Sequence, residues 1–129
     1  MHWTEKYIGR PYVRGIADCA RLVCEVRRQE FRGEVPEETE VVRAQSALGR
    51  ALQVSDGVAV YMEVTDTPED GDVVLVYVRG RPSHVGVFSF LDEPCILHAT
   101  ENAGMTVLHK IRDLPKYGMS VEGYYKWKC

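Results

Sequence analysis

The hydrophobic pattern divides the chain into a helical first half and a second half of strands. Apolar residues at helical spacing after Asp18 predict a helix from Cys19 to about Phe31, with Asp18 as its N-cap. Similar spacing predicts a second helix over about residues 37–53, and a short helical turn is expected at residues 3–7. The first half of the chain is therefore expected to be mainly helical.

From about residue 58 the apolar period changes from the helical value to two, which is typical of strands. Turns rich in Pro, Gly and Asp separate the alternating segments. Helices followed by an antiparallel run of strands predict an α+β fold, with N-terminal helices packed on a sheet of about five to six strands. The expected strands are residues 58–64, 72–78, 84–90, 95–99, 105–109 and 121–127. Residues 110–118, before the last strand, are expected to form a loop.

Length and composition narrow the class of protein. A chain of 129 residues with 45% hydrophobic residues suits one compact domain over residues 1–129 and argues against a disordered chain. The net charge of −3, without a basic stripe, argues against a nucleic-acid partner. The sequence contains no run of about 18 apolar residues, so no membrane span is predicted. The N-terminus lacks the apolar region of a signal peptide, so we expect synthesis in the bacterial cytoplasm.

Cys19 is the first candidate for chemistry because it falls on the first turn of the predicted helix. Unpaired backbone N–H groups and the positive end of the helix dipole favour a thiolate there. A nucleophile needs a base and an orienting group, and two predicted strands each carry one polar histidine, His84 and His98. The hypothesis is a Cys19–His84–His98 site. Each residue taken alone is more often structural than catalytic.

Two residues near Cys19 have a structural and a functional interpretation. Tyr12 either covers the helix or contacts the substrate and the oxyanion through its hydroxyl. Asp18 either caps the helix or meets a cationic group of a substrate, and the two roles are compatible. We expect His2 and His109 to be structural, because nothing in the sequence gives either one a partner.

The remaining cysteines carry less information. Cys24 is expected to be a small buried hydrophobic residue on the same helix as Cys19. The absence of a Cys-x-x-Cys pair argues against a structural zinc site, so no metal is expected. Four cysteines without a secretion signal predict mostly reduced thiols.

Five short blocks in this order resemble the NlpC-type cysteine peptidases: Gly9–Tyr12, Asp18–Val23, Gly71–Val74, His84–Val87 and Leu97–Ala99. The resemblance implies a permuted papain-like fold in which Cys19 is the nucleophile, His84 the base and His98 the orienting residue. It implies that Tyr12 and Asp18 contact the substrate, with Asp18 facing a free amine. Members of this family typically cleave peptidoglycan stem peptides between γ-D-glutamate and a diamino acid, and they need no cofactor.

The chain departs from the family pattern directly after the nucleophile. Ala20 and Arg21 stand where the family has Ser-Gly, which affects the expected specificity more than the chemistry. The short loop before Cys19 is similar to that of phage tail-associated members, which implies a virion association or delivery to the cell wall, with phage tail proteins as partners. Two alternatives stay open: a non-catalytic tail structural or assembly protein, and an amidase or acyltransferase on the same scaffold.

Overall fold

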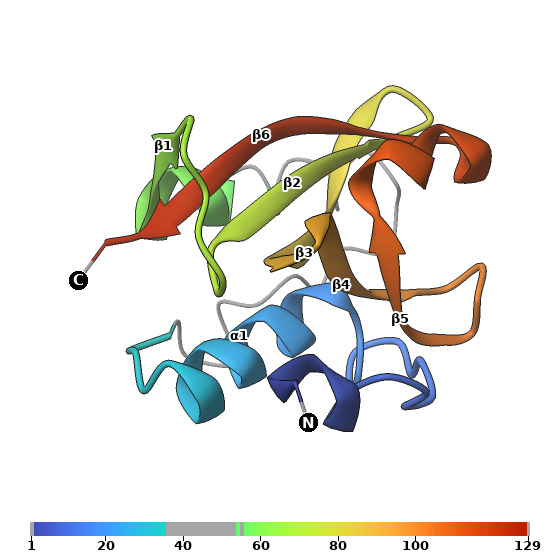
Figure 1. Cartoon of the computed structure of the whole chain (residues 1–129), viewed down its shortest axis with the longest axis horizontal. Helices are drawn as coiled ribbons and strands as arrows, with labels where there is room; N and C mark the ends of the chain where they lie inside the picture. Colours follow the sequence, from blue (N-terminus) through green and yellow to red (C-terminus); the bar gives the residue numbers. More distant parts are fainter. Residues whose placement is uncertain (1, 36–53, 55, 129) are drawn as a thin grey trace.

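The computed structural model describes residues 2–35, 54 and 56–128, and an antiparallel sheet of six strands forms its centre. The strand order is β1-β6-β2-β3-β4-β5 (Figure 1). The strands are β1 (Met62–Thr65), β2 (Val73–Val78), β3 (Arg81–Leu91), β4 (Glu93–Thr100), β5 (Met105–Lys110) and β6 (Met119–Trp127). The named helices are η1 (Trp3–Lys6), α1 (Cys19–Glu30) and η3 (Ile111–Tyr117), of which η1 and η3 are 3-10 helices. Residues 56–61 are also helical.

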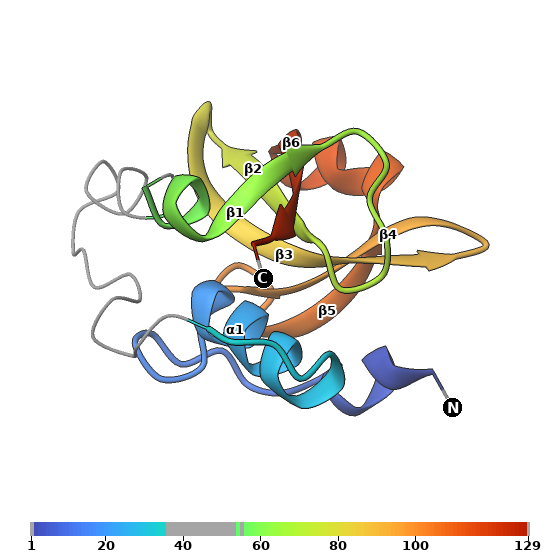
Figure 2. The ribbon, with the colours of Figure 1, turned by 90° about the vertical axis from the view of Figure 1, so that its left-hand side faces the viewer.

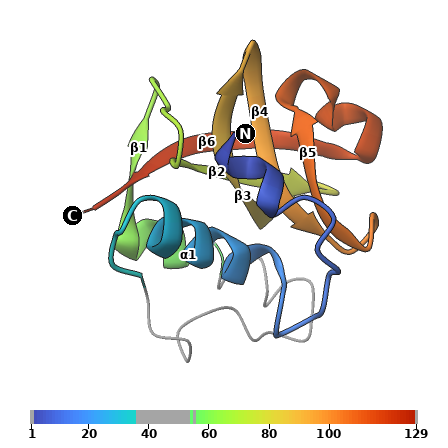
Figure 3. The same cartoon turned by 60° about the horizontal axis from the view of Figure 1, so that its bottom comes forward.

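Helix α1 begins and buries its apolar face as its sequence predicts. The Asp18 side chain accepts a hydrogen bond from the Arg21 N–H, which satisfies one of the unpaired donors of the first turn. Leu22, Val23 and Val26 are buried at helical spacing. They pack against β3 and β4, so α1 covers one side of the sheet (Figures 2 and 3).

The sheet is buried on both sides around β2. Val73 and Leu75 belong to the hydrophobic cluster that includes α1, whereas Val74 and Val76 belong to a second cluster that includes Leu114 of η3. Alternate residues of a strand point to opposite faces, so a strand buried on both sides needs a continuous apolar run. The valine-rich sequence of β2 meets this requirement.

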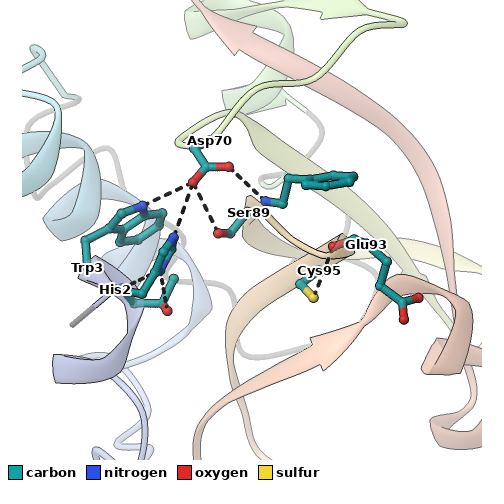
Figure 4. A network of polar contacts seen from close by, with 8 residues as sticks. His2, Trp3, Asp70, Ser89, Glu93 and Cys95 are labelled. Atoms are coloured by element: carbon teal, nitrogen blue, oxygen red, sulfur yellow. Dashed lines mark hydrogen bonds and ion pairs between the residues drawn. The ribbon is translucent and has the colours of Figure 1, made fainter.

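A polar network around Asp70 attaches the N-terminal segment to the sheet (Figure 4). The Asp70 carboxylate accepts hydrogen bonds from the Trp3 indole N–H at 3.3 Å and the Ser89 hydroxyl at 3.3 Å. It also accepts one from the Phe90 backbone N–H at 2.8 Å. His2 lies 3.6 Å from the same carboxylate, and its side chain caps η1 by accepting from the Thr4 N–H. These contacts agree with the structural role expected for His2.

The predicted papain-like α+β fold, with a layer of N-terminal helices on the sheet, is wrong. The described residues form mostly a six-stranded antiparallel sheet, and their longest helix, α1, has only 12 residues. The prediction depended on a second helix at residues 37–53, which lies outside the described residues. The strands of the second half, in contrast, lie close to their expected positions.

Two local predictions were also wrong. Residues 56–61 are helical, and strand β1 starts only at Met62. The valines of this segment fit both a strand and a helix. Val54, Val58 and Met62 are buried at four-residue intervals, which is the spacing of a helix. The segment predicted as a loop before the last strand contains η3, which buries Leu114. In the part of the chain that the structure describes, no helix is both long and apolar enough to cross a lipid bilayer.

Candidate active site

The candidate residues lie at one end of the sheet, because three antiparallel strands have their termini there. β4 ends at Thr100 and β5 begins at Met105, and these two residues are paired across the connecting turn. β3 is antiparallel to β4, so the start of β3 lies at the same end. His84 stands near the start of β3, and His98 stands near the end of β4.

The segment that leads into α1 is attached to this same end of the sheet. The Tyr12 N–H donates to the Gly104 carbonyl at 2.9 Å, and Pro11 forms an isolated bridge with Met105. Val13 and Ala17 then close a tight turn with two backbone hydrogen bonds of 3.1 and 2.7 Å. Cys19 follows Ala17 by two residues, so α1 starts beside the end of the sheet that carries the histidines (Figure 1).

His84 and His98 are in direct contact. His84 Nε2 lies 2.8 Å from His98 Nδ1, which is a hydrogen bond between diagonal neighbours on one face of the sheet. Gly86, next to Val87, which pairs with Leu97 of β4, allows the close approach: a Cβ atom there would lie 3.0 Å from His98 Cβ. Both histidines are buried, and His98 is 0% exposed. The structure thus brings together the two histidines that the sequence selected.

Burial keeps the His98 ring neutral. The pKa of His98 is lowered to about 2, first by desolvation and then by the charges that His84 and His109 carry when protonated. A neutral imidazole has one N–H donor and one acceptor nitrogen. His98 therefore accepts a hydrogen bond on one side of its ring and donates one on the other.

His109 extends the chain of histidines, although it was predicted to have only a structural role. His98 Nε2 lies 3.0 Å from His109 Nδ1. The signal that was missed is the hairpin register: a four-residue turn at residues 101–104 places Val107 opposite His98. Two residues further on, His109 is the diagonal neighbour of His98 on the same face.

Cys19 is the first residue of α1 and is only 2% exposed. The backbone N–H groups of a first helical turn have no partner within the helix, and they stabilise negative charge nearby. Burial raises the pKa of the Cys24 thiol to about 11 and also raises the pKa of the Cys95 thiol. These two cysteines are therefore poor nucleophiles, and Cys24 fits its predicted role as a small buried residue.

Asp18 caps α1, and its carboxylate is also bound on other sides. It accepts hydrogen bonds from the Gly15 N–H at 3.1 Å and the Arg21 N–H at 3.1 Å. The Arg21 guanidinium contacts it at 2.9 Å, and the Asp18 side chain is 3% exposed. A substrate amine at Asp18 would have to compete with Arg21. Tyr12 is partly buried against the cluster around α1, as its structural interpretation predicts.

The three histidines do not converge on one point. Their nitrogens pair in sequence, at 2.8 and 3.0 Å, and no group of three or more potential metal ligands occurs within residues 2–35, 54 and 56–128. The arrangement is that of a chain of three rings joined by two hydrogen bonds. No family model, curated protein or solved structure matches this chain.

Proposed function

We propose that this protein is a cysteine peptidase in which Cys19 is the nucleophile, His84 the general base and His98 the residue that orients the base. The observation that carries the proposal is the 2.8 Å hydrogen bond between His84 and His98 at the end of the sheet where α1 starts. A thiol at a helix N-terminus, a base and an orienting group together satisfy the requirements of nucleophilic catalysis.

The proton transfers follow from which ring nitrogens are paired. His84 Nε2 faces His98, so Nδ1 is the nitrogen that takes the Cys19 proton. The His84 imidazolium then donates its Nε2–H to His98 Nδ1, which stabilises the positive charge and holds the ring. His98 itself stays neutral because its pKa is about 2. The result is a thiolate–imidazolium pair.

The thiolate attacks an amide carbonyl and forms a tetrahedral oxyanion. Backbone N–H groups at the start of α1 are the donors for that oxyanion, with the Tyr12 hydroxyl as a further candidate. His84 gives its proton to the leaving amine, and a thioester to Cys19 remains. Water attacks the thioester with His84 again as the base, which releases the carboxylic acid and restores the thiol.

The proposed substrate is a peptidoglycan stem peptide, cut between γ-D-glutamate and a diamino acid. Support comes from the five sequence blocks that resemble NlpC-type peptidases. The chain's likeness to phage tail-associated members extends the proposal to a virion-associated enzyme that reaches the cell wall. The Arg21 guanidinium on Asp18 favours a substrate that does not depend on an amine contact at Asp18.

Two linked measurements test the function. Iodoacetamide labelling of Cys19 is followed from pH 4 to 9 by peptide mass spectrometry, with Cys24 as an internal control because its pKa is about 11. An activated pair labels rapidly well below the ordinary thiol pKa of about 8.5. Labelling at low pH disappears in His84→Ala. The same preparations are incubated with soluble stem peptides, and the products are identified by mass spectrometry.

We expect Cys19→Ala to abolish hydrolysis and Cys24→Ala to retain it. Full activity in Cys19→Ala would show that another group is the nucleophile. Slow Cys19 labelling that rises only above about pH 8, together with no cleavage of any stem peptide, would refute the enzyme and leave the non-catalytic tail protein as the better explanation.

A further inference from the structure

We propose that His109 is a positioning residue that fixes the tautomer of His98 and, through His98, the tautomer of the base His84. The inference deepens the proposed function and relies on it for the kinetic readout alone. It rests on the two consecutive ring contacts, His84 Nε2 to His98 Nδ1 at 2.8 Å and His98 Nε2 to His109 Nδ1 at 3.0 Å.

The proton positions along the chain are coupled, because each hydrogen bond needs one donor and one acceptor. A base that takes a proton on Nδ1 must carry its resting proton on Nε2, so His84 donates to His98 Nδ1. Neutral His98 then carries its proton on Nε2 and donates it to His109 Nδ1. His109 must accept at Nδ1, which places its own proton on Nε2. Only this order of protons leaves His84 Nδ1 ready to act as a base.

Without an acceptor at position 109 the order is no longer imposed. His98 could then carry its proton on Nδ1 and donate it to His84 Nε2. His84 would have to carry its resting proton on Nδ1, which is the wrong nitrogen to receive the Cys19 proton. A neutral His98 has no charge to enforce its own orientation, so the acceptor on its far side decides between the two tautomers.

The surroundings of His109 hold its ring in place. The ring stacks on Tyr117 of η3, with centroids 4.3 Å apart and planes 9° apart. Burial lowers the pKa of His109, and the negative charge of Asp113 partly offsets this effect. Neutral His109 can accept at Nδ1, which is the form that the chain requires.

Protonation of His109 would turn its Nδ1 into a hydrogen-bond donor. His98 Nε2 would then have to accept, and the proton of His98 would move to Nδ1. Among the described residues, the titratable groups that face His109 are His98 from β4 and Asp113 and Tyr117 from η3. Activity should therefore fall at acid pH in a way that depends on residue 109.

The test compares two substitutions of similar size. His109→Asn keeps an acceptor oxygen close to the position of Nδ1, whereas His109→Leu removes the acceptor and keeps the volume. Stem-peptide hydrolysis gives kcat and KM across pH 5–9, and chemical denaturation shows whether both variants fold. Nitrogen-15 NMR of the wild-type histidine rings reports directly which nitrogen of His84, His98 and His109 carries the proton.

We expect kcat of His109→Leu to fall about 10–100-fold with KM little changed, as for other outer partners of a functional histidine. His109→Asn should have a kcat close to that of the wild type. Its kcat should not show the decrease at acid pH that protonation of His109 causes in the wild type. Equal kcat in both variants and the wild type, or a wild-type spectrum with the His98 proton on Nδ1, would overturn the inference. A wild type that cleaves no stem peptide would refute the proposed function, and the NMR result would still decide the role of His109.

Discussion

Gly86→Ala tests the packing that brings the histidines together. Gly86 lies in β3 next to Val87, which pairs with Leu97 of β4, and it is buried. A Cβ atom at this position would lie 2.5 Å from Ile96 Cγ1, 2.6 Å from Ile96 Cδ1 and 3.0 Å from His98 Cβ. Carbon atoms in contact prefer about 3.5–4.0 Å. The added methyl group therefore forces the side chain of Ile96 to move by about 1 Å and presses against the Cβ atom of His98.

The size of the effect follows from two opposing contributions. Overpacking of a well-packed core costs about 1–3 kcal/mol. Replacing glycine by alanine also restricts the unfolded chain, which stabilises the folded state by about 0.4–1 kcal/mol. We expect a net loss of about 0.5–2 kcal/mol in the free energy of unfolding. If the protein is the proposed peptidase, kcat should fall as well, because a shift of His98 lengthens its hydrogen bond to His84.

Urea denaturation measures the change, with Gly123→Ala as the matched control. A Cβ atom at Gly123 would lie 3.4 Å from the Tyr125 ring, which is close to an ordinary contact. A second variant, Gly86→Ala with Ile96→Val, removes the Ile96 Cδ1 atom and should recover part of the lost stability. Unchanged stability in Gly86→Ala, or no coupling between the two substitutions, would refute this account of the site.

Three further predictions concern other parts of the fold. Asp18→Ala removes the N-cap of α1 and leaves the largely buried Arg21 guanidinium without this carboxylate, so urea denaturation should show a loss of about 2–4 kcal/mol, and Asp18→Asn should lose less. Leu114→Ala should cost about 2–5 kcal/mol in the same assay, because Leu114 is 1% exposed against the sheet. The pKa of His98 is about 2 in the folded state, below its unfolded value, so its contribution to stability is complete above about pH 6.5. That contribution is lost as pH falls, and the free energy of unfolding decreases by up to about 1.4 kcal/mol per pH unit. In His98→Gln the free energy of unfolding should decrease less steeply with falling pH. Equal slopes in the two proteins would contradict the burial of a neutral His98.

Local periodicity predicted α1 and the strands because each depends on neighbours in the sequence. The apolar run after Asp18 determines one face of a helix, and the valines of β2 determine a strand buried on both sides. The same rule failed at Val58 and Val60, where alternation and helical spacing both fit a short segment. Packing decided the outcome: Val58 is buried, and Val60 is 62% exposed.

The architecture could not be read from those local signals. Which strands are neighbours is decided by pairing between segments far apart in the chain, as when β6 lies between β1 and β2. The helix-rich first half was inferred from a pattern at residues 37–53, which lie outside the described residues. The resemblance of five short blocks to a family also implied that family's fold, and the sheet-dominated structure does not have that fold.

One contact among the candidate residues was predicted. The pairing of His84 with His98 followed from two polar residues in apolar strands, and the structure places them in contact. His109 was missed because each histidine was judged within its own strand. Counting the register outward from the turn at residues 101–104 would have identified it as a diagonal neighbour. The contact of Arg21 with Asp18 was missed for a similar reason, since only the cap had been considered.

The buried histidines are difficult to explain by stability alone. His98 is 0% exposed on β4, where a leucine of similar volume would need no hydrogen-bond partner. Both ring nitrogens of His98 have partners, because His84 Nε2 lies beside Nδ1 and His109 Nδ1 lies beside Nε2. One of these two partners can accept the single proton of neutral His98. Three polar rings in a row thus depend on one another, and replacing one leaves the next unsatisfied. Such a chain adds little to folding that apolar side chains would not add, whereas in the proposed thiol–imidazole mechanism it would order the protons of the base.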